Sequence, residues 1–502
     1  MRGSPRRAVV VGAGPGGLAA AMLLRAQGAE VTVIERAPRV GGRTAAIEQD
    51  GYTFDTGPTF FLYPDILREI FAATGRDFDA LVPMHRLDPL YRLRFDDGRT
   101  FDATADVDRL KAEVSRIDPE DARNVDAYLA ANAAKFEAFK PVLQKPFGGL
   151  GAFADVAMVR ALPHLRPWAT VDDDLKRWFR NPLTRLAFSF QSKYLGMSPF
   201  KCPSLFTILA HIEYAHGVWH PVGGCNAIPN AMAKVLEEMG ADVRLDEPVE
   251  EMLFEGRRAV GVRTSQGTYP ADAVVLNADF AHAMKRLVPD RLRRRWTDTR
   301  IDAKSYSCST FMLYLGLEGT LLDQAHHTIF LAGDYARNIR EIEEGLAPAE
   351  PSIYVQNASV TDTTLAPPGH SALYVLVPVG NLSHGRVDWA ATAPAYREMV
   401  LDRLHNLTGR DLRPLIRTER MLTPLDWEAQ GIHAGATFNL AHNLGQMLHL
   451  RPRNRFEDLD RVYLTGGGTH PGSGLPTIFE SARIAARLVS ADIGLNHTEA
   501  AE

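Results

Sequence analysis

The sequence predicts an α/β protein in which a domain with a largely parallel sheet is discontinuous and is interrupted by an inserted domain of mixed sheet and helices. Three observations predict this fold. The length of 502 residues is more than one simple core holds. Two strand–glycine loop–helix patterns stand near opposite ends of the chain, at residues 8–24 and 464–489. Between them, helical periodicity dominates residues 86–220, and strand and helix patterns alternate over residues 301–449.

The composition is that of a globular protein. Hydrophobic residues make up 45%, charged residues make up 23%, and the net charge of −5 gives no reason to expect nucleic acid as a partner. Cys202, Cys225 and Cys308 are far apart, so we expect neither a disulfide framework nor a metal site. The adjacent His326 and His327 do not change this, because neighbouring side chains of a strand point to opposite faces. These features favour a reducing, cytoplasmic compartment.

A βαβ unit opens the chain. The pattern predicts a buried strand over residues 8–11, a helix over 18–27 and a second strand over 30–34. A G-x-G-x-x-G motif joins the first strand to the helix, with its glycines at Gly12, Gly14 and Gly17. The first glycine allows a tight turn, the second lets backbone approach a pyrophosphate, and the third lets helix and strand pack closely. The helix N-terminus adds donors for the phosphates, so the unit predicts a Rossmann-like dinucleotide site. Residues 8–24 contain four glycines and a proline, and the segment is shorter than the ~20 residues of a membrane span.

The residues after the second strand favour FAD as the dinucleotide. Glu35 ends that strand at the distance expected for a ribose hydroxyl, although a solvated carboxylate is the alternative. Gly41, Gly42 and Arg43 follow and can bring backbone and a planar guanidinium to a second part of the pyrophosphate; a surface ion pair is the alternative for the arginine. A strand at 52–55 then ends in a turn at Gly57, which we include among the cofactor-binding residues.

These residues resemble a known family. Residues 12–43 look like the FAD-binding N-terminus of the flavin amine oxidase superfamily. Further stretches resemble the bacterial phytoene desaturase family, so that the resemblance runs from Ala8 to about Ile493; they lie at 187–224, 310–319, 325–330, 358–379 and 450–476. One departure is "LPTIFESARIA" at 475–485, where lycopene-forming members typically carry smaller residues, and it leaves the substrate's length and end group open.

The sequence patterns predict a domain organisation, and the resemblance implies an activity. The FAD-binding domain is expected at residues 1–85, 221–300 and 450–495, the substrate-binding domain at 86–220 and 301–449, and a tail at 496–502. The implied activity is an FAD-dependent desaturation of a long isoprenoid hydrocarbon in carotenoid biosynthesis, phytoene-type (C40) or dehydrosqualene-type (C30), by hydride transfer to flavin N5. The number of steps, the oligomeric state and the final electron acceptor, quinone or oxygen, stay open.

The second glycine loop suggests a support for the flavin ring, some distance from the first unit. A strand over 462–465 ends at three glycines, and a helix begins near Pro476, a residue suited to a first helical turn. Gly467, Gly468 and Pro476 would let backbone come close to the ring, with the positive end of the helix aimed at its pyrimidine side. The alternative is a glycine turn that holds no ligand.

Two polar residues near this loop are candidates for taking up the proton lost by the substrate. Hydride loss first is easier than removal of a proton from a weakly acidic allylic carbon, so a nearby acceptor is needed afterwards. His470 and Glu480 could serve, but His470 could simply bond to backbone in a tight turn and Glu480 could complement the start of its own helix. Asp279, after the strand "AVVLNA", is interpreted as a cap at the end of that strand.

A hydrocarbon substrate predicts contact with a membrane surface. Burying tens of carbons at ~0.8 kcal/mol each makes transfer to water cost on the order of 20 kcal/mol, so the protein must take its substrate from a bilayer. We expect a peripheral membrane protein, with residues 147–171 as an interfacial helix that carries Leu150, Phe153, Val159, Leu162 and Trp168, or else as an ordinary core helix.

Two other functions stay open from the sequence. An amine oxidase-like oxidoreductase of the same fold would need an aromatic cage and a polar channel, which the sequence does not show clearly. A non-catalytic prenyl-lipid-binding protein, similar to the GDP-dissociation inhibitors, would bind no flavin and would therefore be colourless when purified.

Overall fold

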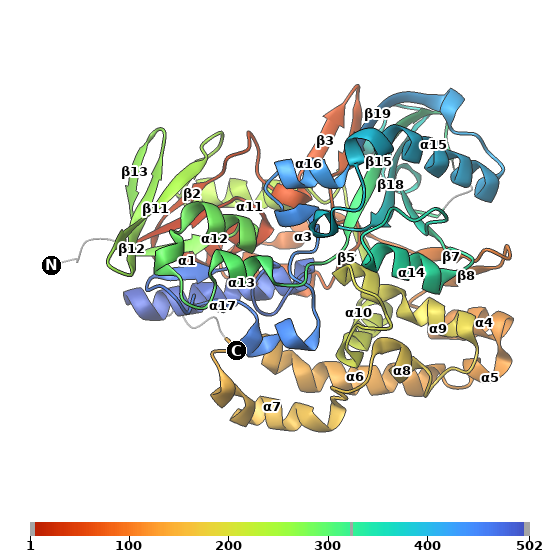
Figure 1. The fold of residues 1–502 in the computed structure, drawn as a ribbon, viewed down its shortest axis with the longest axis horizontal. Coiled ribbons are helices and arrows are strands. Elements are labelled where there is room, and N and C mark those ends of the chain that lie inside the picture. Colours follow the sequence, from red (N-terminus) through yellow and green to blue (C-terminus); the bar gives the residue numbers. More distant parts are fainter. Residues whose placement is uncertain (1–5, 322–324, 496–502) are drawn as a thin grey trace.

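The computed structural model describes residues 6–321 and 325–495, so the predicted tail at 496–502 lies outside it. Two large sheets lie side by side, and a group of helices extends below them in the view of Figure 1. The elements of the first sheet are red, green and blue in that view because they come from distant parts of the chain. The structure is therefore α/β, as the sequence predicts.

The first sheet is parallel throughout and has five strands in the order β10-β2-β1-β14-β20. Its strands are β1 (Arg7–Val11), β2 (Glu30–Ile34), β10 (Asp242–Arg244), β14 (Ala273–Leu276) and β20 (Val462–Leu464). Their carboxyl ends share one edge, which is where open parallel sheets bind ligands. The sheet takes strands from each of the three stretches that the sequence assigns to one domain.

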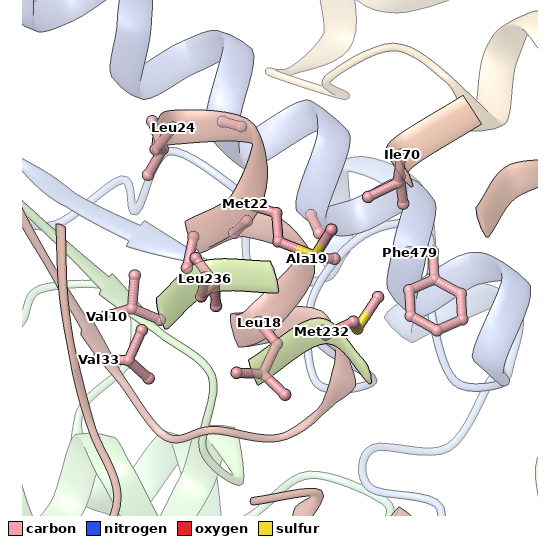
Figure 2. Packing of buried hydrophobic residues seen from close by; sticks show 14 of the residues in the cluster. Val10, Leu18, Ala19, Met22, Leu24, Val33, Ile70, Met232, Leu236 and Phe479 are labelled. Carbon is pink, nitrogen blue, oxygen red and sulfur yellow. The ribbon is translucent and has the colours of Figure 1, made fainter. Parts of the chain in front are cut away.

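Helix α1 (Pro15–Ala26) is the central helix on one face of this sheet. Figure 2 shows Leu18 and Met22 of α1 between the sheet, at Val10, and α11 (Ala227–Glu238), at Met232. Helix α17 (Leu475–Ile493) packs against the other side of α1 and contributes Phe479 to the same core. The helix α1 begins three residues earlier than the sequence predicts, because a proline suits its first turn.

The other face of the first sheet is covered by α12 (Phe280–Leu287) and by a small antiparallel sheet. That sheet consists of β11 (Val249–Glu255), β12 (Arg258–Thr264) and β13 (Gly267–Pro270). Both faces of the parallel sheet are thus buried, which accounts for the continuous apolar run of strands such as "AVVL".

The second sheet has seven strands in the order β19-β15-β18-β17-β16-β7-β8 and is mostly antiparallel, with β16 and β7 paired in parallel. Its strands are β19 (Ile416–Leu422), β15 (Ser309–Glu318), β18 (His370–Val379), β17 (Ile353–Asn357), β16 (His327–Phe330), β7 (Tyr91–Arg94) and β8 (Thr100–Ala103). The sequence predicts a second sheet from residues 301–449 but not the added hairpin β7–β8. Alternate residues of β15 face α15 (Trp389–Thr408), as Phe311 does, while Met312 faces the other way.

Helices between residues 107 and 216 form the lower part of the molecule in Figure 1. They are α4 (Val107–Ile117), α5 (Pro119–Ala122), α6 (Val125–Leu143), α7 (Val156–Ala161), α8 (Val171–Leu175), α9 (Pro182–Ser189) and α10 (Ile208–His216). The single interfacial helix predicted over 147–171 is wrong: α7 has six residues and lies between 3₁₀ turns at Leu150–Ala154 and Leu162–His164. Gly149, in a conformation no helix uses, and Pro163, which lacks an N–H, prevent a longer helix.

Short elements connect these parts. They are β3 (Ala46–Gln49), β4 (Tyr52–Asp55), β5 (Phe61–Leu62), α2 (Asp65–Ala72), α3 (Phe78–Leu81), β6 (Met84–Arg86), β9 (Val218–Pro221), α13 (Asp298–Asp302), α14 (Tyr335–Glu343) and α16 (Pro424–Ala429). In the part of the chain that the structure describes, no helix combines the length and the apolar character needed to cross a bilayer.

Candidate functional site

A cavity of about 1550 Å³ lies between the carboxyl edge of the first sheet and the inner face of the second. Ligand sites usually occupy roughly 300–1,000 Å³, so this cavity has room for more than one ligand. Its wall is polar and glycine-rich at the first sheet and apolar at the second. We describe the two ends in turn.

The first glycine loop forms part of the polar end. A Cβ added at Gly12, whose φ is +98°, would stand 2.5 Å from the Asn277 carbonyl oxygen, and one at Gly14 would stand 2.9 Å from the Asn277 Nδ2. A Cβ at Gly17 would stand 2.2 Å from the Gly12 carbonyl oxygen. Gly12 and Gly14 line the cavity and Gly17 does not, which matches the separate roles of backbone approach and helix packing.

Glu35 lies at the end of β2 in the wall of the cavity. One carboxylate oxygen accepts from the Ala13 N–H at 2.8 Å and the other accepts from the Ala37 N–H at 2.9 Å. The carboxylate therefore fastens the glycine loop to the next strand, a role that the sequence does not indicate. Each oxygen can still accept a second hydrogen bond, so a ribose contact stays a prediction.

Arg43 and Gly42 before it both line the cavity, whereas Gly41 does not. Arg43 Nη1 donates to the Thr437 carbonyl oxygen at 2.5 Å, and burial lowers the pKa of Arg43 although Asp279 opposes the shift. In the amide orientation that satisfies both neighbours, Asn439 accepts from Arg43 Nη2 at 3.0 Å and donates to Asp279 at 2.8 Å. The guanidinium is thus held inside the molecule by polar neighbours rather than in a surface ion pair.

Asp279, interpreted from the sequence as a cap at the end of a strand, caps the start of helix α12 instead. Its Oδ1 accepts from the His282 N–H at 3.0 Å at the start of α12. The same side chain also belongs to the cavity wall, which the sequence interpretation does not include.

Asn277, which sequence reasoning missed, joins the two glycine loops. It follows β14, the strand between β1 and β20, and its Oδ1 would lie 3.1 Å from a Cβ added at Gly466. A Cβ at Gly16 would meet Ile478 Cγ2 of α17 at 2.8 Å. The two loops are therefore neighbours, not distant supports as expected. The position of an asparagine at the carboxyl end of a central strand was the available signal.

Arg451 holds the second glycine loop in place by hydrogen bonds to its backbone. This side chain is fully buried, and it donates to the carbonyl oxygens of Gly467 at 2.7 Å and Thr469 at 3.0 Å. Gly467 and Pro476 line the cavity. Gly468 does not, because it packs against α12, where an added Cβ would stand 2.7 Å from the Phe280 Cβ.

His470 and Glu480 are not part of the cavity wall. His470 is 2% exposed beside Phe147, and burial lowers its pKa to about 4. Glu480 points to Arg483 Nη1 at 3.5 Å, and burial raises its pKa. The structure thus does not bring either proton-acceptor candidate to the site. Ile478 of α17 lines the cavity. Glu480 is two residues further along the helix, so its side chain projects at about 200° from that of Ile478, away from the cavity.

The apolar end is lined by aliphatic side chains of the second sheet and the helices, including Leu62, Leu209, Ile212, Met312, Ile353 and Leu376. Two tyrosines stand among them, neither foreseen from the sequence. Tyr374 of β18 donates to the Gly57 carbonyl oxygen at 2.8 Å, and the Tyr354 hydroxyl of β17 lies 2.7 Å from Thr59 Oγ1. The turn at Gly57, itself in the cavity wall, is thus held where the polar and apolar ends meet.

Buried histidines lie behind this turn. His326 and His327 do not point to opposite faces, because β16 begins only at His327, and their ring centroids are 4.4 Å apart. The His220 ring lies 4.7 Å from that of His326. Among the described residues no group of His, Cys, Asp and Glu has the arrangement of a metal site.

Comparisons with known proteins identify the family. Residues 15–490 match the model of the flavin-containing amine oxidoreductases. The chain belongs to this family. It is 44% identical over 486 residues to the 4,4'-diapophytoene desaturase (4,4'-diapolycopene-forming) of Methylomonas sp., covering 96% of this chain and 94% of that protein. It is 37% identical over 495 residues to the neurosporene-forming phytoene desaturase of Rhodobacter capsulatus, covering 96% and 94%. Among solved structures, an oxidoreductase from Methanosarcina mazei superposes with a TM-score of 0.64 at 18% identity, over 97% of this chain and all of that one, which shows the fold.

The polar end of the cavity has the chemistry that a member of this flavin-containing family needs for FAD. Helix α1 starts at the cavity with no side chain capping its first turn, so its donors remain for an anion. Gly12, Gly14 and Gly467 present backbone where a Cβ would find no space. Arg43 adds a partly buried cation suited to a phosphate.

Proposed function

We propose that this protein is an FAD-dependent desaturase that removes two hydrogens from neighbouring carbons of a long isoprenoid hydrocarbon, of the diapophytoene or phytoene type, and leaves a double bond. One observation carries the proposal: a single cavity joins a polar, glycine-rich end to a long apolar end at the turn that contains Gly57. The names of the two relatives support this substrate class.

In this proposal the chain's own residues divide the work between the two ends. Gly12 and Gly14 receive the pyrophosphate of FAD, Glu35 the ribose and Arg43 a second part of the pyrophosphate, while Gly467 and Pro476 adjoin the ring. FAD, when bound, supplies the acceptor for two electrons and one hydrogen. The aliphatic wall holds the hydrocarbon and excludes water, which would otherwise capture a cationic centre in the substrate.

Pigment formation in two hosts tests this function. The protein is expressed in one host that makes phytoene and in another that makes dehydrosqualene, and absorbance identifies the products. Coloured polyenes in either host, with a yellow purified protein that shows a bound-flavin spectrum, are the expected result. Absence of pigment in both hosts would reject the proposal, and colourless protein that refuses added FAD would support a lipid carrier instead. Amine oxidation without pigment would favour the amine oxidase alternative. Anaerobic reactions with a quinone, compared with aerobic ones, identify the electron acceptor.

We also propose that α7 and its flanking turns dock on a membrane, from which the substrate enters. Four apolar side chains project into solvent here: Val156, Val159, Leu162 and Trp168, exposed by 64%, 52%, 52% and 78%. The buried side of α7 packs near Leu448, and Asn443, five residues earlier in the chain, lines the cavity. An exposed apolar segment of this kind enters the headgroup region of a bilayer.

A liposome flotation assay tests the docking surface. Leu150, whose side chain lies outside the described structure, and Phe153, which packs against Phe147 and His449, are poor sites for substitution. We instead expect Val159→Asp with Trp168→Asp to abolish flotation. Leu425→Asp, in α16 on the opposite side of the molecule in Figure 1, is the matched control and should float like wild type. Equal flotation of the double variant would contradict the docking proposal.

A further inference from the structure

Tyr354 lines the apolar end of the cavity, beside the turn at Gly57. The side chain belongs to β17 and lines the cavity. Its hydroxyl lies 2.7 Å from Thr59 Oγ1 and 2.8 Å from His327 Nδ1. A polar atom in the wall of a hydrocarbon site is thereby connected to an ionisable group behind the wall.

His327 is a buried, neutral histidine whose ring can accept a proton. It is 0% exposed, and its ring stacks on Phe60 with centroids 4.0 Å apart and planes at 14°. Burial lowers its pKa well below the ordinary histidine value, with nearby His220 adding to the effect, so the ring is neutral at rest. Its Nε2 has no hydrogen-bond partner among the described residues. A buried ring nitrogen without a partner destabilises the folded protein, so stability alone does not explain this histidine.

The two acceptor candidates from the sequence and one lysine of the cavity wall serve this purpose less well. His470 and Glu480 do not line it. Lys193 does, beside the Tyr335 ring at 4.7 Å, but its pKa of about 8 leaves it mostly charged at neutral pH, when it cannot take up a proton.

We propose that Tyr354 and His327 together accept the proton that the substrate loses during desaturation. The inference rests on the proposed function. FAD, when bound, would supply the acceptor for the hydrogen and electron pair of one carbon, so that the substrate to be deprotonated is a cation. The C–H bond on the neighbouring carbon then breaks, and its electrons form the double bond. The released proton binds the Tyr354 oxygen while the hydroxyl proton of Tyr354 moves to His327 Nδ1. Tyr354 is then the catalytic residue, and His327 acts through it.

Two further histidine rings pack close to His327, although no hydrogen bond joins its Nε2 to either of them among the described residues. The rings of His326 and His220 follow at centroid distances of 4.4 and 4.7 Å, and His220 Nε2 lies 3.1 Å from a carboxylate oxygen of Asp362. The low pKa of His327 favours release before the next desaturation.

Isotope effects in Tyr354→Phe test the chemical step, with Tyr374→Phe as the matched control. Both tyrosines line the cavity and bond to the same turn, but the Tyr374 hydroxyl donates to a carbonyl group, which cannot take a proton onward. Two substrates are used, one deuterated at the carbon that loses the electron pair and one at the carbon that loses the proton. We expect Tyr354→Phe to slow desaturation by about 10²-fold, with an isotope effect that newly appears at the proton-losing carbon. Tyr374→Phe should show no such effect.

A wild-type rate in Tyr354→Phe, or a slow rate with an isotope effect confined to the electron-pair-losing carbon, would overturn the proposal. A second measurement does not depend on activity. In FAD-free protein with ¹⁵N-labelled histidine, we expect a neutral His327 with an unprotonated Nδ1, whose resonance shifts in Tyr354→Phe and not in Tyr374→Phe. A protonated Nδ1 in the resting protein would refute the acceptor role. Failure of the wild type to make pigment, with these resonances as expected, would instead reject the proposed function.

Discussion

Gly17→Ala should separate the packing of the glycine motif from its contact with FAD. The added methyl would stand 2.2 Å from the Gly12 carbonyl oxygen and 2.9 Å from the Asn277 Cβ. An extra methyl in a packed core costs about 1–3 kcal/mol. Because the nearest obstacle here is backbone rather than the end of a flexible side chain, we expect the upper limit of about 3 kcal/mol. Moving the start of α1 away from β1 relieves the strain. The same movement displaces the glycine backbone that is expected to bind the dinucleotide.

Two measurements check this prediction. Urea unfolding of the FAD-free protein should show the loss of about 3 kcal/mol, and fluorescence titration should show FAD binding weakened at least tenfold, or by 1.4 kcal/mol. Gly148→Ala is the control, because Gly148 is exposed and an added Cβ there meets nothing within 4 Å. Unchanged unfolding and unchanged FAD binding in Gly17→Ala would refute the packing argument.

Three further substitutions test single residues. Arg43→Lys keeps the charge but loses the planar fork, and should weaken FAD binding about tenfold by titration, whereas unchanged affinity would place Arg43 away from the phosphates. Glu480→Gln should be more stable to urea than wild type at pH 8. The pKa of Glu480 is raised in the folded state, so the wild type loses stability as pH rises above about 4.5. The variant should keep full desaturase activity, and lost activity would restore Glu480 as a catalytic candidate. The lowered pKa of His470 predicts that the free energy of unfolding of the wild type falls by about 2 kcal/mol between pH 6.5 and pH 5, because the unfolded chain binds a proton that the folded chain excludes. Urea unfolding at both pH values should show that His470→Gln removes this dependence.

The parts of the site that depend on local sequence spacing are the parts that the sequence predicts. Gly12, Gly14 and Glu35 act within one βαβ unit, where spacing in sequence determines position in space. Asn277 was missed because its contact with Gly12 spans 265 residues and depends on β14 pairing with β1. Tyr354 was missed for a similar reason, since only the register of the second sheet brings it to the turn at Gly57.

The misplaced candidates have equally physical causes. The pattern of α17 shows that it is a helix but not which way it is rotated against α1, so Glu480 could be assigned to either face. In residues 147–171 the apolar spacing is typical of one helix, but Gly149 and Pro163 divide the segment into short turns.

The order of strands in the first sheet also constrains how the protein is made. β20 is the last of the described strands along the chain, and it pairs with β14, so the parallel sheet cannot be completed before residue 464 has left the ribosome. Contacts between such distant residues form slowly, because the intervening chain must be ordered first. Until then, β14 is an unpaired edge strand of the nascent chain. A chain truncated before residue 462 should therefore be degraded or aggregate rather than persist as a partly active enzyme.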